Sequence, residues 1–167
     1  RIKRLTSRED PDAPVKVTDR PGAKPLPPLS SAIELEHVSV GYGRGPVVID
    51  IDMRIPRGEV HALVGPSGAG KSTLAMLLPR FMDPDEGAVR IDGHDLRDVT
   101  LESLRGQIAL VTQETHLFEG TIAENIAYGK ADPSRDAIRR AADAANAAGF
   151  IEAFEHGYDT ALGDKGG

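Results

Sequence analysis

The 167-residue sequence contains no cysteine and no uninterrupted run of 18 apolar residues. The lack of cysteine excludes disulfide bonds and thiolate metal sites and suits a reducing compartment. The lack of a long apolar run excludes a membrane-spanning helix among these residues. The five histidines lie at least 22 positions apart, so their spacing predicts surface or packing roles and no histidine metal site.

The charge and the length narrow the possibilities further. The net charge of −6 argues against nucleic acid as the main partner. The length fits one ordinary domain with a single core. The first residue is Arg1 and not Met, so we expect the chain to be processed, excised or incomplete.

The most informative stretch is Gly65–Ser72, with the sequence GPSGAGKS. It fills the pattern G-x-x-x-x-G-K-[ST], in which backbone N–H groups of a glycine-rich loop surround the phosphates of a nucleotide. Lys71 is predicted to reach the β- and γ-phosphates, and the Ser72 hydroxyl is predicted to ligate Mg²⁺. The predicted nucleotide-binding residues of this loop are Gly65, Ser67, Gly68, Ala69, Gly70, Lys71, Ser72 and Thr73. We therefore expect ATP and Mg²⁺ as ligands.

The residues on either side of the loop fit a strand–loop–helix unit. The apolar run 60–64 predicts a buried strand. Residues 72–82 predict a helix, because Leu74, Leu77, Leu78 and Phe81 follow the helical spacing i, i+3, i+4, i+7. Pro79 deprives the Ala75 carbonyl of its usual partner, so the helix is expected to end or bend there.

Residues 1–32 differ in composition from the remainder. They hold six of the twelve prolines and a net charge of +3, which leaves −9 for the other residues. They contain few large apolar residues, so we expect an extended linker that does not build a core. The domain proper is expected to cover residues 33–167.

Alternating apolar residues predict strands after this linker. Residues 33–40 alternate with a slip of one position, which predicts a bulge near His37. Residues 47–55 alternate cleanly and predict its antiparallel partner. Two further strands are expected over 88–92 and 107–112, the second of them buried. Short helices are expected over 101–105 and 121–128, and a longer helix capped by Ser134 is expected to break at Gly149.

Several of these segments together resemble the nucleotide-binding domain of ATP-binding cassette (ABC) transporters of the exporter type. The run IELEHVSVGYG is similar to the opening strand and the adenine-stacking loop of that family. Residues 65–129 are similar to its phosphate loop through its glutamine loop, and TALGDKG (160–166) is similar to the loop before its LSGGQ segment. The resemblance covers residues 21–167. It implies an α/β fold, an incomplete P-loop NTPase core of the ABC ATPase type with an antiparallel β subdomain on its N-terminal side.

The resemblance also implies roles for two residues outside the phosphate loop. Tyr42 would stack on adenine, and Gln113 would approach Mg²⁺ in a supporting catalytic role alongside Lys71. Residues 113–120 would contact the transmembrane domain, and Leu117 and Phe118 are apolar enough for such a docking surface or for a local core. Residues 1–32 would then be the linker from an upstream transmembrane domain. A second nucleotide-binding domain would complete a dimer at the cytoplasmic face of the membrane.

The sequence departs from the family in its extent. It ends at Gly167, before the LSGGQ segment, the Mg²⁺-binding aspartate, the catalytic glutamate and the switch histidine. Because hydrolysis needs a carboxylate that orients or deprotonates the attacking water, we expect these residues to bind ATP without hydrolysing it, whereas the longer parent protein would be an ATPase.

Three other functions stay open at the level of sequence. A soluble ABC-type ATPase without a membrane partner would share the same motifs. A truncated chain that only binds nucleotide is a second alternative, and a P-loop kinase is a more distant one because no lid or acceptor-site pattern is present. The transported substrate and the choice between homodimer and heterodimer are set by residues outside this sequence.

Overall fold

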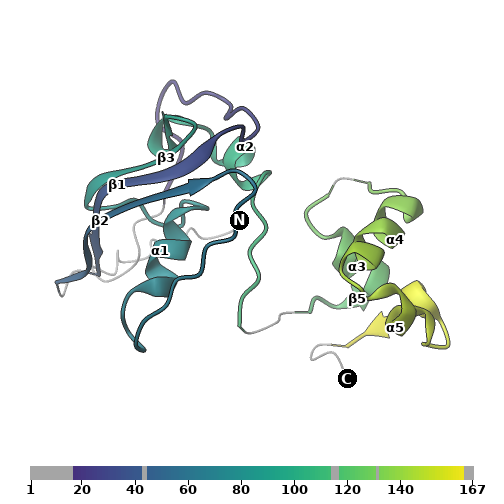
Figure 1. The fold of residues 1–167 in the computed structure, drawn as a ribbon. Helices are drawn as coiled ribbons and strands as arrows, with labels where there is room; N and C mark the ends of the chain where they lie inside the picture. Colours follow the sequence, from purple (N-terminus) through teal and green to yellow (C-terminus); the bar gives the residue numbers. More distant parts are fainter. Residues whose placement is uncertain (1–16, 43–44, 114–116, 131, 164–167) are drawn as a thin grey trace, which may run out of the picture. The chain divides into compact units, whose positions relative to one another are not determined.

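The chain divides into two compact units in the computed structural model, residues 1–109 and residues 110–167 (Figure 1). The structure describes residues 17–42, 45–113, 117–130 and 132–163. Within this part of the chain, no helix has the length and apolarity needed to cross a bilayer. Each unit has its own apolar core, so the two are treated separately below.

An antiparallel sheet forms most of the first unit. Its strands are β1 (Ala32–Gly41), β2 (Pro46–Pro56), β3 (Glu86–Ile91) and β4 (His94–Asp95), in the order β2-β1-β3-β4. The pairings β1–β2 and β1–β3 are antiparallel, with Leu35 opposite Met53 on one side and opposite Val89 on the other. The expected strands over 33–40, 47–55 and 88–92 are confirmed.

A bulge at His37 keeps β1 in phase with the core. The pairing with β2 shifts between Leu35 and Val38, and His37 adopts a left-handed φ of 49°. The extra residue lets Leu35, Val38 and Val40 all face the core, where they are 5%, 0% and 1% exposed. The slip in the alternating pattern therefore marked a real bulge.

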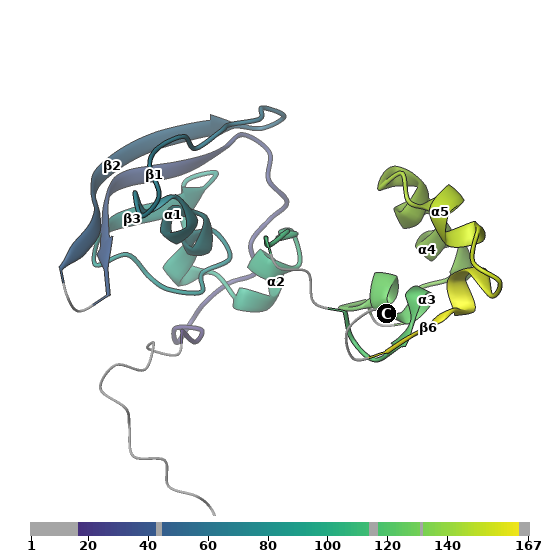
Figure 2. The same ribbon diagram turned by 90° about the horizontal axis from the view of Figure 1, so that it is seen from below.

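Helix α1 (Lys71–Leu77) packs beneath the curved face of this sheet (Figure 2). Its residue Leu77 is 1% exposed and lies in the same core as Val48 of β2. The core also receives side chains from the connection after β4. Its buried members are Leu26, Leu35, Val38, Val40, Val48, Leu77, Val89, Ile91, Leu96, Val99 and Leu104.

The helix is shorter than the apolar spacing predicts, since it ends at Leu77 and the chain turns at residues 78–80. The expectation that Pro79 ends it is confirmed. Arg105, at the end of α2 (Leu101–Arg105), donates to the carbonyls of Pro79 and Arg80 at 2.9 and 3.0 Å. These bonds satisfy backbone carbonyl oxygens that would accept hydrogen bonds within the helix if the helix continued.

Two predicted buried strands are not strands in the structure. Residues 60–64 and 108–112 have no regular secondary structure, and Val60, Val64 and Val111 are 98%, 91% and 95% exposed. The predictions over 60–64 and 107–112 are therefore wrong for this chain. The physical reason is that a strand forms only beside a neighbouring strand that takes up its backbone hydrogen bonds, and neither run belongs to a sheet among the described residues.

The N-terminal stretch is more closely packed than a linker is expected to be. Lys24 donates its backbone N–H to Asp98 at 3.1 Å and accepts from Thr100 at 3.0 Å, which forms a parallel bridge. Leu26 is 5% exposed within the core. The side-chain amide of Gln107 donates to the carbonyls of Leu26 and Pro27. Leu26 thus joins a core that the sheet and α1 build, although residues 1–32 were expected to form an extended linker that does not build a core itself.

Asp92, which follows β3, fixes the start of β1. Its carboxylate accepts hydrogen bonds from the backbone N–H groups of Ser30, Ser31 and Ala32 and from the Ser30 hydroxyl, at 2.6–2.9 Å. The bond from the Ser30 backbone is the largest cause of a pKa of Asp92 that lies well below its ordinary value. The carboxylate thereby replaces strand pairing where the chain enters β1.

The second unit is a small helical cluster closed by a two-residue ladder of β5 (Gly120–Thr121) and β6 (Ala161–Leu162). Its helices are α3 (Ile122–Ala127), α4 (Arg135–Ala144) and α5 (Ala148–Glu152). Thr121 and Glu124 form a capping box at α3, and the Ser134 hydroxyl accepts from the Ala137 N–H at α4, as expected. Gly149 lies inside α5, so the predicted break there is wrong. The chain turns at Asn146 instead, with a φ of 56°.

We expect the exposed run 60–64 to cause self-association. Unpaired backbone next to exposed valines offers an edge to which another chain can add. Replacing Val60 and Val64 with lysine should lower the apparent mass in sedimentation velocity at high protein concentration. Phe150→Lys is the control, because Phe150 is 64% exposed but lies in helix α5, which offers no strand edge. An equal fall in apparent mass with Phe150→Lys would contradict an edge-specific mechanism.

Asp92 predicts a defined pH dependence of stability. The folded-state pKa of Asp92 lies below the unfolded value of 3.8. The contribution of Asp92 to the free energy of unfolding is therefore complete above pH 3.8, and it is lost as the pH falls toward the folded-state pKa. Asp92→Asn should lower the urea midpoint at pH 7, and the gap to wild type should narrow between about pH 5 and about pH 3. Asp98→Asn, which removes an exposed ion pair with Arg20, should change the midpoint little at either pH. A gap that does not depend on pH would disprove the assignment.

Candidate functional site

The predicted phosphate loop connects residue 64 to α1 without regular secondary structure. Residues 66–70 form bends and turns, and residues 59–69 are exposed to solvent. Gly68 and Gly70 adopt left-handed φ values of 80° and 81°. Two such residues separated by one position turn successive N–H groups toward the same side of the chain, as an anion-binding concavity requires. The loop therefore has the backbone form that its sequence predicts.

Gly70 is where the loop meets the sheet. A Cβ on Gly70 would lie 2.5 Å from Cγ2 of Val48 and 3.2 Å from the carbonyl oxygen of Val47. The loop thus approaches β2 as closely as two backbones without an intervening side chain allow. This contact fixes the first turn of α1 against the core.

Lys71 reaches back across the loop. Its ammonium group donates to the carbonyls of Gly65 and Pro66 at 2.8 and 2.7 Å. An ammonium group has three donors, so two hold the loop closed and one is left for a phosphate oxygen. Lys71 therefore acts on the loop's shape and adds a positive charge at its mouth.

Tyr42 lies close to the phosphate loop although 31 residues separate it from Thr73. The Tyr42 hydroxyl is 3.1 Å from Oγ1 of Thr73, in the first turn of α1. Thr73 is 6% exposed, whereas Tyr42 is 56% exposed. The phenol end of the side chain is thus anchored while much of its surface stays open to a ligand.

A pocket of about 310 Å³ lies between β2 and the phosphate loop. Its volume is at the lower end of the range for ligand pockets, about 300–1,000 Å³. It is lined by Val47, Ser67, Gly68, Ala69, Gly70, Lys71, Ser72 and Thr73. The structure therefore brings together seven of the eight loop residues that the sequence nominates, and Gly65 contacts them through Lys71.

Gln113 and the expected docking residues belong to the second unit. Gln113 is exposed, and residues 114–116 of the expected docking segment lie outside the described residues. Leu117 and Phe118 are 42% and 47% exposed. The Phe118 ring stacks on Tyr128 with centroids 4.1 Å apart, and Asn125 bonds both the N–H and the carbonyl of Phe118. Phe118 is thus ordered yet accessible.

A histidine–carboxylate group on the strands was missed by the sequence analysis. His37 Nδ1 lies 2.9 Å from Asp50 and 3.3 Å from Asp52. The hydrogen bond to Asp50 is the main cause of a raised pKa of His37. Spacing among histidines could not reveal this group, because both carboxylates come from the neighbouring strand. One possible metal-ligand atom from each of His37, Asp50 and Asp52 lies within 4.8 Å of the other two. All three side chains are exposed. Their contacts link His37 and Asp50, two non-glycine residues with left-handed backbones.

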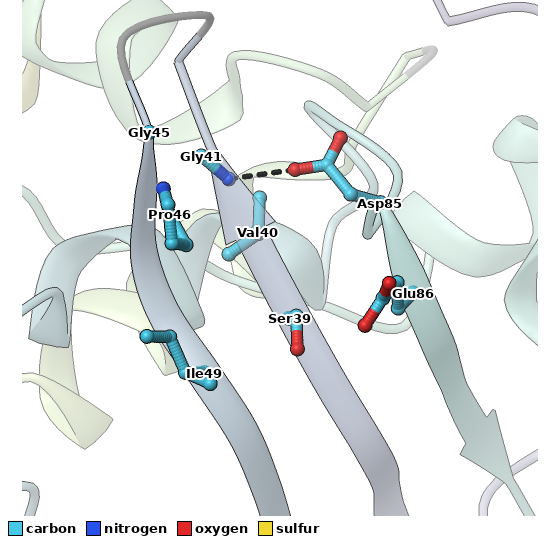
Figure 3. A pocket seen from close by; sticks show the side chains of 8 residues that line it. All are labelled: Ser39, Val40, Gly41, Gly45, Pro46, Ile49, Asp85 and Glu86. Carbon is cyan, nitrogen blue, oxygen red and sulfur yellow. Dashed lines mark hydrogen bonds between the residues drawn. The ribbon is translucent and has the colours of Figure 1, made fainter.

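A second pocket, of about 430 Å³, lies where β1, β2 and β3 meet near Tyr42 (Figure 3). It is lined by Ser39, Val40, Gly41, Gly45, Pro46, Ile49, Asp85 and Glu86. The carboxylate of Asp85 accepts from the backbone N–H of Gly41 at 2.8 Å, the bond drawn in Figure 3. Nothing in the sequence pattern singles out Asp85.

Comparison with known proteins agrees with this geometry. The sequence model of the ABC transporter family matches residues 48–162. The chain is 51% identical over 155 residues to an ATP-dependent lipid A-core flippase of Desulfotalea psychrophila, and 49% identical over 150 residues to a flippase of the same description from Syntrophus aciditrophicus. These alignments cover 93% and 90% of this chain, but 27% and 25% of the relatives. The chain therefore spans about a quarter of the length of these relatives.

A solved structure of an ABC exporter also resembles this chain. A bacterial Atm1-family ABC exporter with ATP bound superimposes with a TM-score of 0.84 at 42% identity, over 93% of this chain and 28% of that one. The chain belongs to the ABC transporter family, and its fold is that of the family's ATPase domain in part, with the antiparallel sheet on its N-terminal side. Membership in the family implies that these residues carry an ATP-binding domain of the exporter type.

The two loop glycines allow a matched test of the close approach to β2. Gly68→Ala forces an alanine into a left-handed backbone in open space, which costs about 1–2 kcal/mol. Gly70→Ala adds the collision with Val48 to a similar backbone cost, so it should destabilise the first unit more. Urea unfolding followed by circular dichroism measures both. Equal losses of stability would show that the loop does not press on the sheet.

Proposed function

We propose that this chain binds Mg²⁺-complexed ATP at the phosphate loop, as the nucleotide-binding part of an ABC exporter. The carrying observation is the closed loop, in which Gly68 and Gly70 are left-handed and the Lys71 ammonium bridges two loop carbonyls. The Lys71 ammonium and the loop N–H groups would hold the β- and γ-phosphates, and Ser72 would ligate Mg²⁺. The Tyr42 ring would stack on adenine.

The lining of the smaller pocket suits a polyphosphate. It contains backbone N–H groups, the hydroxyl groups of Ser67, Ser72 and Thr73, and the Lys71 ammonium, and none of the described residues lines it with a carboxylate. A bound Mg²⁺ would neutralise charge on the phosphate oxygens. Gln113, which lies in the second unit, would take the supporting role toward Mg²⁺ that the family resemblance implies.

The wider role is export driven by ATP in the longer protein. In support, the relatives named above are described as ATP-dependent flippases, and the solved structure as an exporter. Residues 1–32 would join an upstream transmembrane domain to the domain over 33–167, and residues 113–120 would contact that membrane part at the cytoplasmic face of the membrane. A second nucleotide-binding domain would close over the nucleotide. Hydrolysis would use a catalytic glutamate supplied beyond these residues.

A soluble ABC-type ATPase remains the competing function. The high identity to lipid A-core flippases over more than nine-tenths of the chain favours an exporter. The continuous reading frame around this sequence distinguishes the two, because an exporter requires apolar helices upstream of Arg1. A frame without them would leave the ATP-binding proposal standing and overturn the export proposal.

ATP binding is tested by removing the Lys71 ammonium. Lys71→Ala should weaken Mg²⁺–ATP binding by about tenfold or more, since a charge-assisted hydrogen bond is lost and the loop opens. Calorimetric titration of the wild type and the variant measures the change. Lys130→Ala, which removes an exposed lysine of the second unit, is the charge-matched control and should bind as the wild type does. Wild-type affinity in Lys71→Ala would refute the proposal.

A further inference from the structure

The position of the Tyr42 ring depends on both of its ends. At the phenol end, the hydroxyl meets Thr73 in α1 at 3.1 Å. At the backbone end, the preceding residue Gly41 donates its N–H to the Asp85 carboxylate at 2.8 Å. Residues 43–44, which follow Tyr42, are outside the described part of the chain. The Asp85 bond and the pairing of Gly41 with Pro46 are thus the last described backbone attachments of β1 before the ring.

Asp85 is itself well fixed. Its own backbone N–H donates to the carbonyl of Ser39 at 2.9 Å, so Asp85 and the end of β1 exchange two hydrogen bonds. The next residue, Glu86, pairs with Ser39 in the sheet. Figure 3 shows the Asp85 carboxylate aimed at Gly41 across the top of the pocket, while Glu86 lies farther down the strands.

The sheet pairing at Gly41 is close but irregular. Gly41 pairs with Pro46 of β2, and a Cβ on Gly41 would collide with the carbonyl oxygen of Gly45, so the two arms of the turn approach each other closely at this point. The regular register between β1 and β2 is also lost here, with a shift between Val40 and Gly41. Because the sheet pairing is irregular at Gly41, an additional acceptor for its N–H has a larger effect on the chain direction than it would in a regular ladder.

We infer that Asp85 is a positioning residue for nucleotide binding: its carboxylate orients Gly41 and thereby holds the Tyr42 ring where it meets adenine. The inference rests on the proposed ATP function. Asp85 does not line the pocket at the phosphate loop, so it acts through Tyr42 and not on the phosphates. A ring that is already ordered loses less conformational entropy on binding, and this is the source of the added affinity.

The test separates the adenine from the phosphates. Mg²⁺–ATP and Mg²⁺–tripolyphosphate are titrated calorimetrically into the wild-type chain and into Asp85→Ala, with circular dichroism as a check on folding. Asp85→Ala should weaken ATP binding by about fivefold and change tripolyphosphate binding by less than about twofold. The loss of a negative charge near the site would instead strengthen the binding of ATP and of tripolyphosphate alike. The ratio of the two affinities therefore does not depend on that charge effect.

Three further variants complete the design. Asp85→Asn keeps an acceptor for the Gly41 N–H and should retain most of the ATP affinity. Glu86→Ala removes the neighbouring carboxylate of the same pocket and should leave the ratio of the two affinities unchanged. In a Tyr42→Ala background, Asp85→Ala should have no further effect, because there is no ring left to position.

The outcomes distinguish this inference from the proposed function. If Tyr42→Ala weakens ATP binding but Asp85→Ala does not, the positioning role is overturned and the ATP site stands. The positioning role is also overturned if Asp85→Ala weakens the binding of both ligands equally, or if Asp85→Asn binds ATP as weakly as Asp85→Ala does. It is overturned as well if Asp85→Ala still weakens ATP binding in the Tyr42→Ala background. If Tyr42→Ala and Lys71→Ala both bind ATP as the wild type does, the proposed function itself fails.

Discussion

The burial of α1 beneath the antiparallel sheet is the constraint on which the site depends. Leu77 and Val48 meet in the core, and Gly70 lets the start of the helix touch β2 directly. Burying a leucine side chain contributes about 1.5–3 kcal/mol, so this contact outweighs any single polar bond in the loop. The phosphate loop is solvent-exposed over residues 65–69, and only Gly70 is buried. Its shape is set by the helix that follows it and by the Lys71 bonds across its mouth.

The sequence predicted β1 and β2 well because these two strands pair with each other locally. Alternation over 33–40 and 47–55 requires only a neighbour a few residues away, and the slip at His37 corresponds to a bulge in the structure. The same reasoning failed over 60–64 and 107–112. Those runs have strand composition, but backbone pairing depends on partners that local patterns do not reveal, and Val60 and Val111 are almost fully exposed. Whether a segment forms a strand thus depends on neighbouring strands as well as on its own residues.

Side-chain acceptors that hold the backbone were the features that sequence patterns could not locate. Asp92 collects four hydrogen bonds at the entry to β1, and Asp85 holds its end. Both lie in turn sequences rich in aspartate and glycine, where the pattern predicts a change of direction but not the distant residue that the carboxylate reaches. Asp92 and Ser30 are 62 positions apart. Such contacts appear only when the strands are in place.

The three glycines of the phosphate-loop motif at positions 65, 68 and 70 are present for different physical reasons. Gly70 is required by the chain's own packing, because a Cβ would strike Val48. Gly68 is favoured by its left-handed backbone alone, since a Cβ there would meet open space. Gly65 has neither reason, because an added Cβ would make only an ordinary 3.5 Å contact with Ala69 and its φ is not left-handed. Folding therefore accounts for glycine at 70 and in part at 68. At position 65 the reason must come from outside these contacts, and close approach of a phosphate to the backbone is the one that the proposed function supplies.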